Sequence, residues 1–253
     1  AALWRNNDRG WVSHALIWSL VCAGILGLGI IMGGFWAYEA LSFGGYWAWD
    51  PVENASLMPW LIMASAAHML IITKATGRHL FTSHLLTQIA FWLVLYATFL
   101  TRSGILGDAS VHSFTDLGLS GQLLLFLLAF LAFALVVVLQ GKKRMMALYG
   151  ILTALLLPMV LSYSISSPEA IETFYQWLKG LGTVLFVGWL VYYIYVLYQR
   201  TKADMGDEAL HSREFWMFLG SMFLILSLVQ VFAATSIPVF NKLFGYKTAV
   251  PAA

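Results

Sequence analysis

The chain has 253 residues, of which 60% are hydrophobic and only 10% are charged. Such a composition cannot present an ordinary solvated surface, so it excludes a soluble protein and places the chain in a lipid bilayer. The formal net charge of +2 is uninformative, and we expect no nucleic-acid partner.

Apolar runs of membrane-spanning length recur along the whole chain and leave no room for a soluble domain. They should all be helices, because lipid offers no partners to unpaired backbone groups and the runs lack the alternation of a membrane barrel. The sequence therefore predicts an all-α, polytopic membrane helix bundle that forms one transmembrane domain over residues 1–253. The seven predicted spans cover residues 13–37, 57–73, 84–101, 119–140, 147–165, 180–199 and 215–236.

Basic residues are distributed unevenly between the two sides of this predicted bundle. One set of loops carries 10 of them and the alternate set carries 4. The first set is Arg5, Arg9, Lys74, Arg78, Lys142, Lys143, Arg144, Arg200, Lys202 and Arg213, and the second is Arg102, Lys179, Lys242 and Lys247. Because cytoplasmic loops collect Lys and Arg, the loop after the first span should face outward, which in a bacterial inner membrane is the periplasm.

This first outer loop, at about residues 42–56, is aromatic, acidic and amide-bearing at once. It lies in the segment GGYWAWDPVENASLMPW, residues 44–60, and eight aromatic residues fall among the 26 residues 35–60. The tryptophans could belong to the aromatic belt that anchors helices at headgroup level. A belt, however, needs neither the intervening acidic and amide groups nor four tryptophans around one loop.

We therefore interpret the segment as a wall for a flat ligand such as a porphyrin, where each ring contact contributes about 0.5–1.5 kcal/mol beyond area burial. The candidate residues are Tyr46, Trp47, Trp49, Asp50, Pro51, Glu53, Asn54 and Trp60.

The same loop is predicted to be stiff. Pro51 fixes its own φ and pushes Asp50 toward an extended conformation. Ser56 is the predicted N-cap of the second span, with Pro59 in the first helical turn, where a missing N–H costs little.

The loop resembles the tryptophan-rich WWD signature of the haem-handling membrane proteins of cytochrome c biogenesis, and the likeness is greatest to the CcmF type. Three further segments resemble CcmF segments in the same order: AAHMLIITKATG after the loop, FLTRSGILGDASVHSF after the third span and SREFWMFLGS before the seventh. The match is weakest between about residues 120 and 205.

His68 is the histidine that the sequence places deepest in the bilayer, about 18 Å along its helix from Ser56. A polar ring is expensive there, so it either bonds to a neighbouring helix or has a functional role. The resemblance implies that His68 ligates the iron of a resident, intramembrane haem.

His112 lies in the second outer loop, at about residues 102–118, on the same side as the aromatic loop. A lone loop histidine is usually just solvated, but the surrounding SVHSF is similar to the family segment that carries a ligand of the external haem. Arg102 in the same loop could pair with a haem propionate, or it could be an ordinary interfacial arginine.

The resemblance implies a haem lyase component with haem b as cofactor, which holds haem outside and adds the two CxxCH thiols of an apocytochrome c across the haem vinyl groups. No acid, base or nucleophile of this chain is assigned to that reaction. The expected partners are the apocytochrome, a haem donor chaperone, other cytochrome c maturation subunits and membrane lipid. Alternatives are a haem exporter or chaperone without attachment activity, and a cytochrome b-like electron-transfer subunit, which would need more than one deep histidine.

The family pattern also includes a partner for each of these two histidines, and neither partner motif occurs in the sequence. We therefore expect the chain to be an internal segment of a longer protein or a short homologue completed by a partner subunit.

Overall fold

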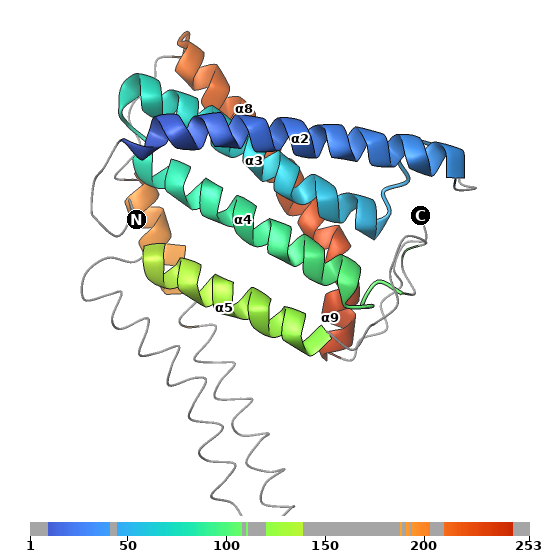
Figure 1. Cartoon of the computed structure of the whole chain (residues 1–253). Helices are drawn as coiled ribbons and strands as arrows, with labels where there is room; N and C mark the ends of the chain where they lie inside the picture. The colour runs from blue at the N-terminus through green and yellow to red at the C-terminus, as the bar shows by residue number, and fades with distance from the viewer. Residues whose placement is uncertain are drawn as a thin grey trace, which may run out of the picture.

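The structure is a computed structural model that describes residues 10–40, 45–107, 110, 120–138, 188, 191–192, 194–202 and 210–244. Within these ranges all regular structure is helical (Figure 1). The helices are α2 (Trp11–Ala40), α3 (Pro51–Thr76), α4 (Leu80–Arg102), α5 (Ser120–Val138), α8 (Arg213–Thr235) and α9 (Ile237–Phe244).

Four of these helices, α2, α3, α4 and α8, are long and apolar enough to cross a membrane. They correspond to the first, second, third and seventh predicted spans, and α5 falls within the fourth. The fifth predicted span lies outside the described residues. Of the sixth, only residues 188, 191–192 and 194–199 are described, and these are helical. The prediction of an all-helical membrane bundle is thus confirmed as far as the described chain reaches.

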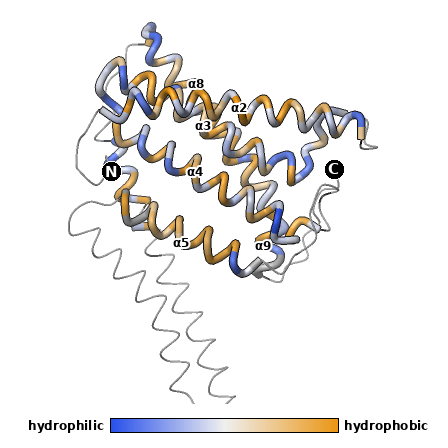
Figure 2. Tube along the Cα trace, viewed as in Figure 1, coloured by the Kyte–Doolittle hydropathy of each residue, from blue (hydrophilic) through white to orange (hydrophobic). Residues whose placement is uncertain are grey.

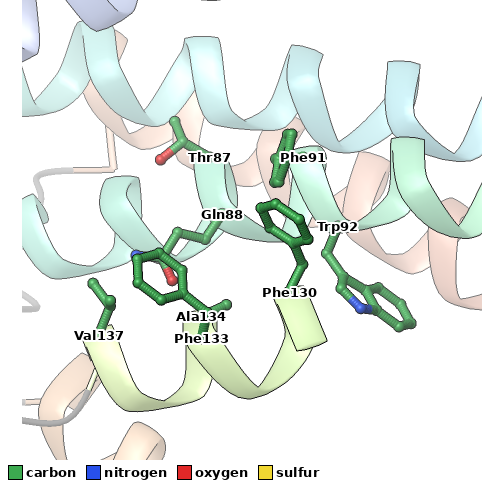
Figure 3. Close-up of a pocket in the computed structure, with 8 residues that line it drawn as sticks. All are labelled: Thr87, Gln88, Phe91, Trp92, Phe130, Phe133, Ala134 and Val137. Carbon is green, nitrogen blue, oxygen red and sulfur yellow. The ribbon is translucent and has the colours of Figure 1, made fainter. Parts of the chain in front are cut away.

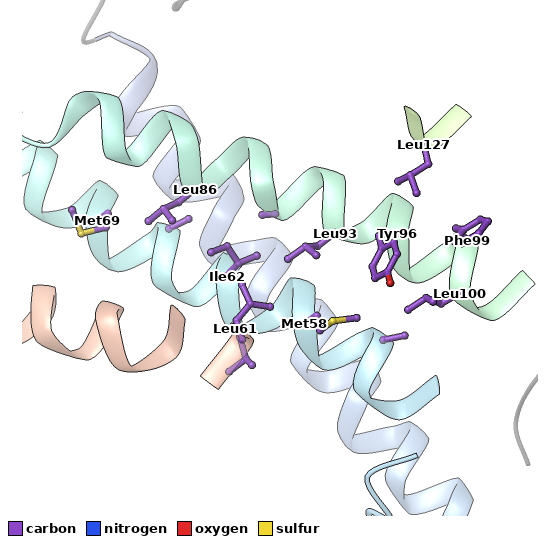
Figure 4. Packing of buried hydrophobic residues seen from close by; sticks show 14 of the residues in the cluster. Met58, Leu61, Ile62, Met69, Leu86, Leu93, Tyr96, Phe99, Leu100 and Leu127 are labelled. Atoms are coloured by element: carbon purple, nitrogen blue, oxygen red, sulfur yellow. The ribbon is translucent and has the colours of Figure 1, made fainter. Parts of the chain in front are cut away.

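Helix α3 is the centre of the described bundle, since it packs against α2, α4 and α8, while α5 packs on the far side of α4 (Figure 1). The core forms mainly between α3 and α4, where Met58, Ile62 and Met69 of α3 share one buried cluster with Leu86, Leu93 and Leu100 of α4 (Figure 4). Lipid tails are as apolar as these side chains, so close packing and interhelical hydrogen bonds hold the helices together, rather than exclusion of water.

Two hydrogen bonds fasten the C-terminal helices to this core. The hydroxyls of Ser65 on α3 and Ser221 on α8 lie 2.6 Å apart, and both residues are buried. The Tyr96 hydroxyl on α4 lies 2.7 Å from that of Ser236, which separates α8 from α9. Both bonds join segments at least 140 residues apart in sequence.

The start of the second span is where the sequence prediction was wrong. Helix α3 begins at Pro51 with Asp50 as its N-cap, six residues before the expected first turn. Ser56 lies inside the helix, where its hydroxyl donates to the Glu53 carbonyl at 2.7 Å, and Pro59 is likewise interior. The helix begins at Pro51 because the Asp50 carboxylate accepts a backbone N–H of the first turn, and proline at the first helical position has no N–H that would need a partner.

Candidate functional site

The candidate site is built on the turn that joins α2 to α3. The Asp50 carboxylate accepts a hydrogen bond from the Val52 N–H at 2.8 Å, while Glu53 Oε2 accepts from the Asp50 N–H at 3.3 Å. This reciprocal arrangement is a capping box. Glu53 Oε2 also accepts from the Ala48 N–H at 2.9 Å, which extends the restraint into the aromatic segment. Asp50 has the extended conformation predicted before Pro51, with φ −59° and ψ 141°, and this set of bonds restrains the turn.

Trp49 is held in an unusual backbone conformation by its neighbours. Its φ is 58°, in the left-handed region that bulky residues avoid. Strain of this kind costs about 1–3 kcal/mol and persists only where the surroundings impose it. Here the Asn54 side-chain amide donates to the Trp49 carbonyl at 2.9 Å. The Trp49 indole remains 64% exposed on this strained backbone.

The other loop aromatics are arranged around this indole. Trp47 meets Trp49 edge to face, with ring centroids 6.0 Å apart. Tyr46 stacks on Tyr38 of α2 at 4.4 Å, which ties the loop back to the first helix. Gly34 makes this approach possible, since a Cβ there would lie 2.7 Å from the Tyr46 carbonyl oxygen. The loop thus presents a fixed aromatic surface whose outer rings are Tyr46 and Trp49.

Three polar atoms in this turn are buried and have no hydrogen-bond partner within the described chain. They are Nε1 of Trp47, Oε1 of Glu53 and Oδ1 of Asn54. An unsatisfied buried polar group costs about 1–3 kcal/mol. One unpaired donor and two unpaired acceptors thus lie in the turn that carries the exposed aromatic faces. A planar ligand with a polar edge, or ordered water, would supply their missing partners.

The structure also joins the two outer loops, which the sequence did not anticipate. The Ser110 hydroxyl donates to Oδ1 of Asp50 at 2.6 Å across 60 residues of sequence. Of the second outer loop, Arg102 is the exposed last residue of α4. His112 lies outside the described residues.

Trp60 is placed differently from the loop aromatics. It lies within α3, and its indole N–H donates to the Ala23 carbonyl of α2 at 3.1 Å. In the described chain this ring packs α2 against α3, so its assignment to a ligand wall stays a prediction.

His68 lies on α3 seventeen residues after Pro51, about 26 Å along the helix at 1.5 Å per residue. It is therefore well separated from the aromatic loop and nearer the other end of the helix. The half-buried ring places Nδ1 2.7 Å from the Ala64 carbonyl oxygen. A carbonyl can only accept, so Nδ1 is the donor, and in the neutral ring this tautomer leaves the lone pair on Nε2. A hydrogen bond of this kind is what orients a metal-ligating histidine.

The flank of α3 that carries His68 lies between two packed sides. Trp60, eight residues earlier, faces α2, and Ser65, three residues earlier, faces α8. At 3.6 residues per turn the side chain of His68 projects between these two directions. A ligand of His68 would thus meet α3 between α2 and α8, away from the core that α3 shares with α4.

A cavity of about 220 Å³ lies elsewhere, between α4 and α5 (Figure 3). Its walls include Phe91, Trp92, Phe130 and Phe133, and it contains none of the candidate haem residues. Cofactor sites usually enclose about 300–1,000 Å³, so this cavity is too small for a porphyrin.

Comparison with known proteins identifies the chain's relatives. Residues 6–106 match the family model described as cytochrome C assembly protein, a range that contains the aromatic loop, α3 and α4. This part of the chain is similar to that family. The resemblance to the CcmF type inferred from the aromatic loop is thereby confirmed.

The chain is similar to several proteins named cytochrome c-type biogenesis protein CcmF. It is 42% identical to that of Haemophilus influenzae over 143 residues, or 56% of this chain and 21% of the relative. It is 35% identical to that of Pseudomonas aeruginosa over 131 residues, or 52% of this chain and 19% of the relative. The match therefore spans about a fifth of the length of these curated relatives. No solved structure matches the chain.

Proposed function

We propose that this chain forms part of a haem-handling membrane protein of cytochrome c maturation. In this proposal the aromatic surface of Tyr46, Trp47 and Trp49 holds haem at the periplasmic face of a bacterial inner membrane. The haem is presented there to an apocytochrome c, whose CxxCH thiols add to the haem vinyl groups. The observation that carries the proposal is the strained, capped turn that keeps the Trp49 indole exposed.

The polar residues of the turn have a positioning role in this proposal. The start of α3 is capped by Asp50, Pro51 and Glu53, and the Asn54 amide donates to the Trp49 carbonyl. These hydrogen bonds are therefore made within the protein. Oε1 of Glu53 and Oδ1 of Asn54 are buried without a partner in the described chain, so a ligand or water would have to enter the turn to bond with them. Positioning of this kind is the usual contribution of a protein where the cofactor carries the chemistry.

The second outer loop would supply the remaining contacts. His112 is the proposed axial ligand of the external haem iron, and Arg102 is the proposed partner of a propionate. Arg102 suits this role because a guanidinium forms paired hydrogen bonds with a carboxylate. The bond from Ser110 to Asp50 supports the proposal, since it brings this loop to the aromatic surface.

His68 would hold a separate, resident haem b. Such a haem, when bound, supplies one-electron redox chemistry. The chain's own contribution is the orientation of the imidazole, through the bond from Nδ1–H to the Ala64 carbonyl. The further partners in this proposal are a haem donor chaperone, other cytochrome c maturation subunits and the surrounding lipid.

The experiment replaces Trp49 by Ala in the complete protein and, separately, His112 by Ala. Both variants should lose most of the holocytochrome c yield and bind added hemin more weakly, because each removes a wall or a ligand of the same haem. Trp18→Ala is the matched control, since the Trp18 indole is 67% exposed on α2, far from the loop in sequence. Wild-type yield in both site variants would remove the proposed site.

A haem exporter would use the same aromatic loop. Haem flux measured in vesicles without apocytochrome separates the two functions, because attachment requires the acceptor and export does not. Rapid flux in the wild-type protein that is lost in the Trp49→Ala variant would favour export.

A further inference from the structure

A row of half-buried residues runs along α3 and contains His68. Its members recur at intervals of three and four residues, so they lie on one face of the helix. We call this row the His68 face, and it consists of Leu57, Trp60, Ala64, His68 and Ile71. On the side of α3 that meets α8 the neighbouring residues, Leu61, Ser65 and Ile72, are buried. The His68 face is therefore a strip that the packed neighbours of α3 leave partly open.

Ala64 has the smallest side chain of the His68 face and lies one helical turn before His68. Its backbone carbonyl accepts the hydrogen bond from His68 Nδ1 at 2.7 Å. Side chains four residues apart on a helix lie one above the other. The space beside the imidazole is therefore bordered, on the Ala64 side, by a single methyl group. A larger side chain at this position would fill that space without removing the carbonyl that orients the ring.

Trp60 is the large aromatic residue one turn further along the same face. Its indole N–H donates to the Ala23 carbonyl of α2 at 3.1 Å. The indole also lies close to α2, since a Cβ at Gly27 would be 2.8 Å from Trp60 Nε1. These contacts direct the ring toward α2, so it borders the space beside Ala64 rather than filling it.

We propose that Ala64 keeps room beside His68 for a porphyrin and thereby determines whether the resident haem is admitted, with Trp60 as the fixed border of that room. An imidazole can ligate the iron of a broad, flat group only if no neighbouring side chain blocks its approach. Leu57 and Ile71, by contrast, are large aliphatic residues of the kind that lipid accommodates, and alanine stands only next to the histidine. This inference rests on the proposed function, because it concerns the haem assigned to His68.

The test compares Ala64→Leu with Ala64→Ser in the complete protein, purified without added hemin. Bound haem per protein is measured by absorption, in a Trp49→Ala background that weakens the proposed external site. Both replacements keep the carbonyl that holds His68 Nδ1, but only leucine fills the space beside the ring. We expect Ala64→Leu to retain about a tenth or less of the haem, because an overfilled site is strongly disfavoured. Ala64→Ser should stay within about twofold of the background.

Ala233→Leu is the matched control, because it adds the same side chain at an exposed position of α8. It should leave the haem content unchanged. Thermal unfolding of each variant separates loss of haem from loss of fold. If Ala64→Leu does not fold, the smaller Ala64→Val replacement decides, and it should fold with clearly less haem than Ala64→Ser.

Haem content at the level of Ala64→Ser in a folded Leu or Val variant would overturn the role of Ala64. If His68→Ala then still loses the haem, the resident haem of the proposed function stands and this inference alone has failed. If His68→Ala also keeps its haem, the proposed assignment of His68 has failed.

Discussion

Helices α2 and α3 are both long and apolar and follow one another in the chain, yet they are buried to very different extents. In the most apolar stretch of α3, 61% of residues are buried inside the protein, against 6% for α2. Helix α2 is the more apolar of the two, with a mean hydropathy of 2.4 against 1.7 in the most apolar stretch, and orange predominates along it in Figure 2. In lipid the most apolar helix is the one that can face outward, whereas the central helix carries small and polar residues that allow contact with several neighbours.

The residues on each helix agree with this difference. The exposed side chains of α2 include Ile25, Leu28 and Ile31, which lipid accommodates without a protein partner. Helix α3 instead buries Ala55, Ala66 and Ser65 against α4 and α8. Its candidate functional residues are the Asp50 cap at its N-terminal end and His68 on the flank between α2 and α8.

The largest effect should come from truncating equivalent side chains on the two helices. Ile62→Ala on α3 removes a side chain that is 1% exposed and should destabilise the protein by about 2–5 kcal/mol. Ile31→Ala on α2, at 71% exposure, should stay within about 0.5 kcal/mol of wild type. Denaturant unfolding in mixed detergent micelles measures both. Similar losses in the two variants would mean that α2 is not an outer helix.

A smaller effect is expected where the two helices touch. A Cβ at Gly27 would lie 2.8 Å from Trp60 Nε1, the atom that bonds to Ala23. Gly27→Ala must therefore displace this indole, and overpacking of this kind costs about 1–3 kcal/mol. Gly24→Ala and Gly29→Ala are matched controls on the same helix, since a Cβ at either would meet nothing within 4 Å. The same unfolding measurement, with Trp60 fluorescence as a local probe, should separate Gly27 from its controls.

The smallest effect should come from the bond that ties α3 to α8. A double-mutant cycle of Ser65→Ala and Ser221→Ala should give a coupling energy of about 0.6 kcal/mol, the average for interhelical hydrogen bonds in membranes. The coupling energy is small because the two hydroxyls also form hydrogen bonds in the unfolded state within the membrane. A coupling indistinguishable from zero would mean that the two hydroxyls are satisfied separately.

Some features of the site could be read from local sequence alone. The stiff turn follows from Asp50 and Pro51, because capping and the restriction before proline act between adjacent residues. The helix start was nevertheless misplaced at Ser56, since several polar residues in a row can each serve as a cap and only the folded chain selects one. The left-handed conformation of Trp49 could not be predicted from the sequence, because the bond between the Asn54 amide and the Trp49 carbonyl is one of many that Asn54 could make.

The amino-acid sequence by itself predicted an all-helical membrane bundle, which the described residues confirm, and an aromatic loop that resembles the cytochrome c assembly family. Apolar length and local motifs are properties of short segments, and each can be recognised without its neighbours. Only the tertiary structure decided that α3 is central, that Trp60 packs against α2, and that Ser110 reaches Asp50. The Trp60 and Ser110 contacts join residues 37 and 60 positions apart in the sequence. In lipid, moreover, the hydrophobic effect does not favour one apolar helix as a partner over another. Their arrangement therefore depends on side-chain shape and hydrogen bonds that exist only once the helices have met.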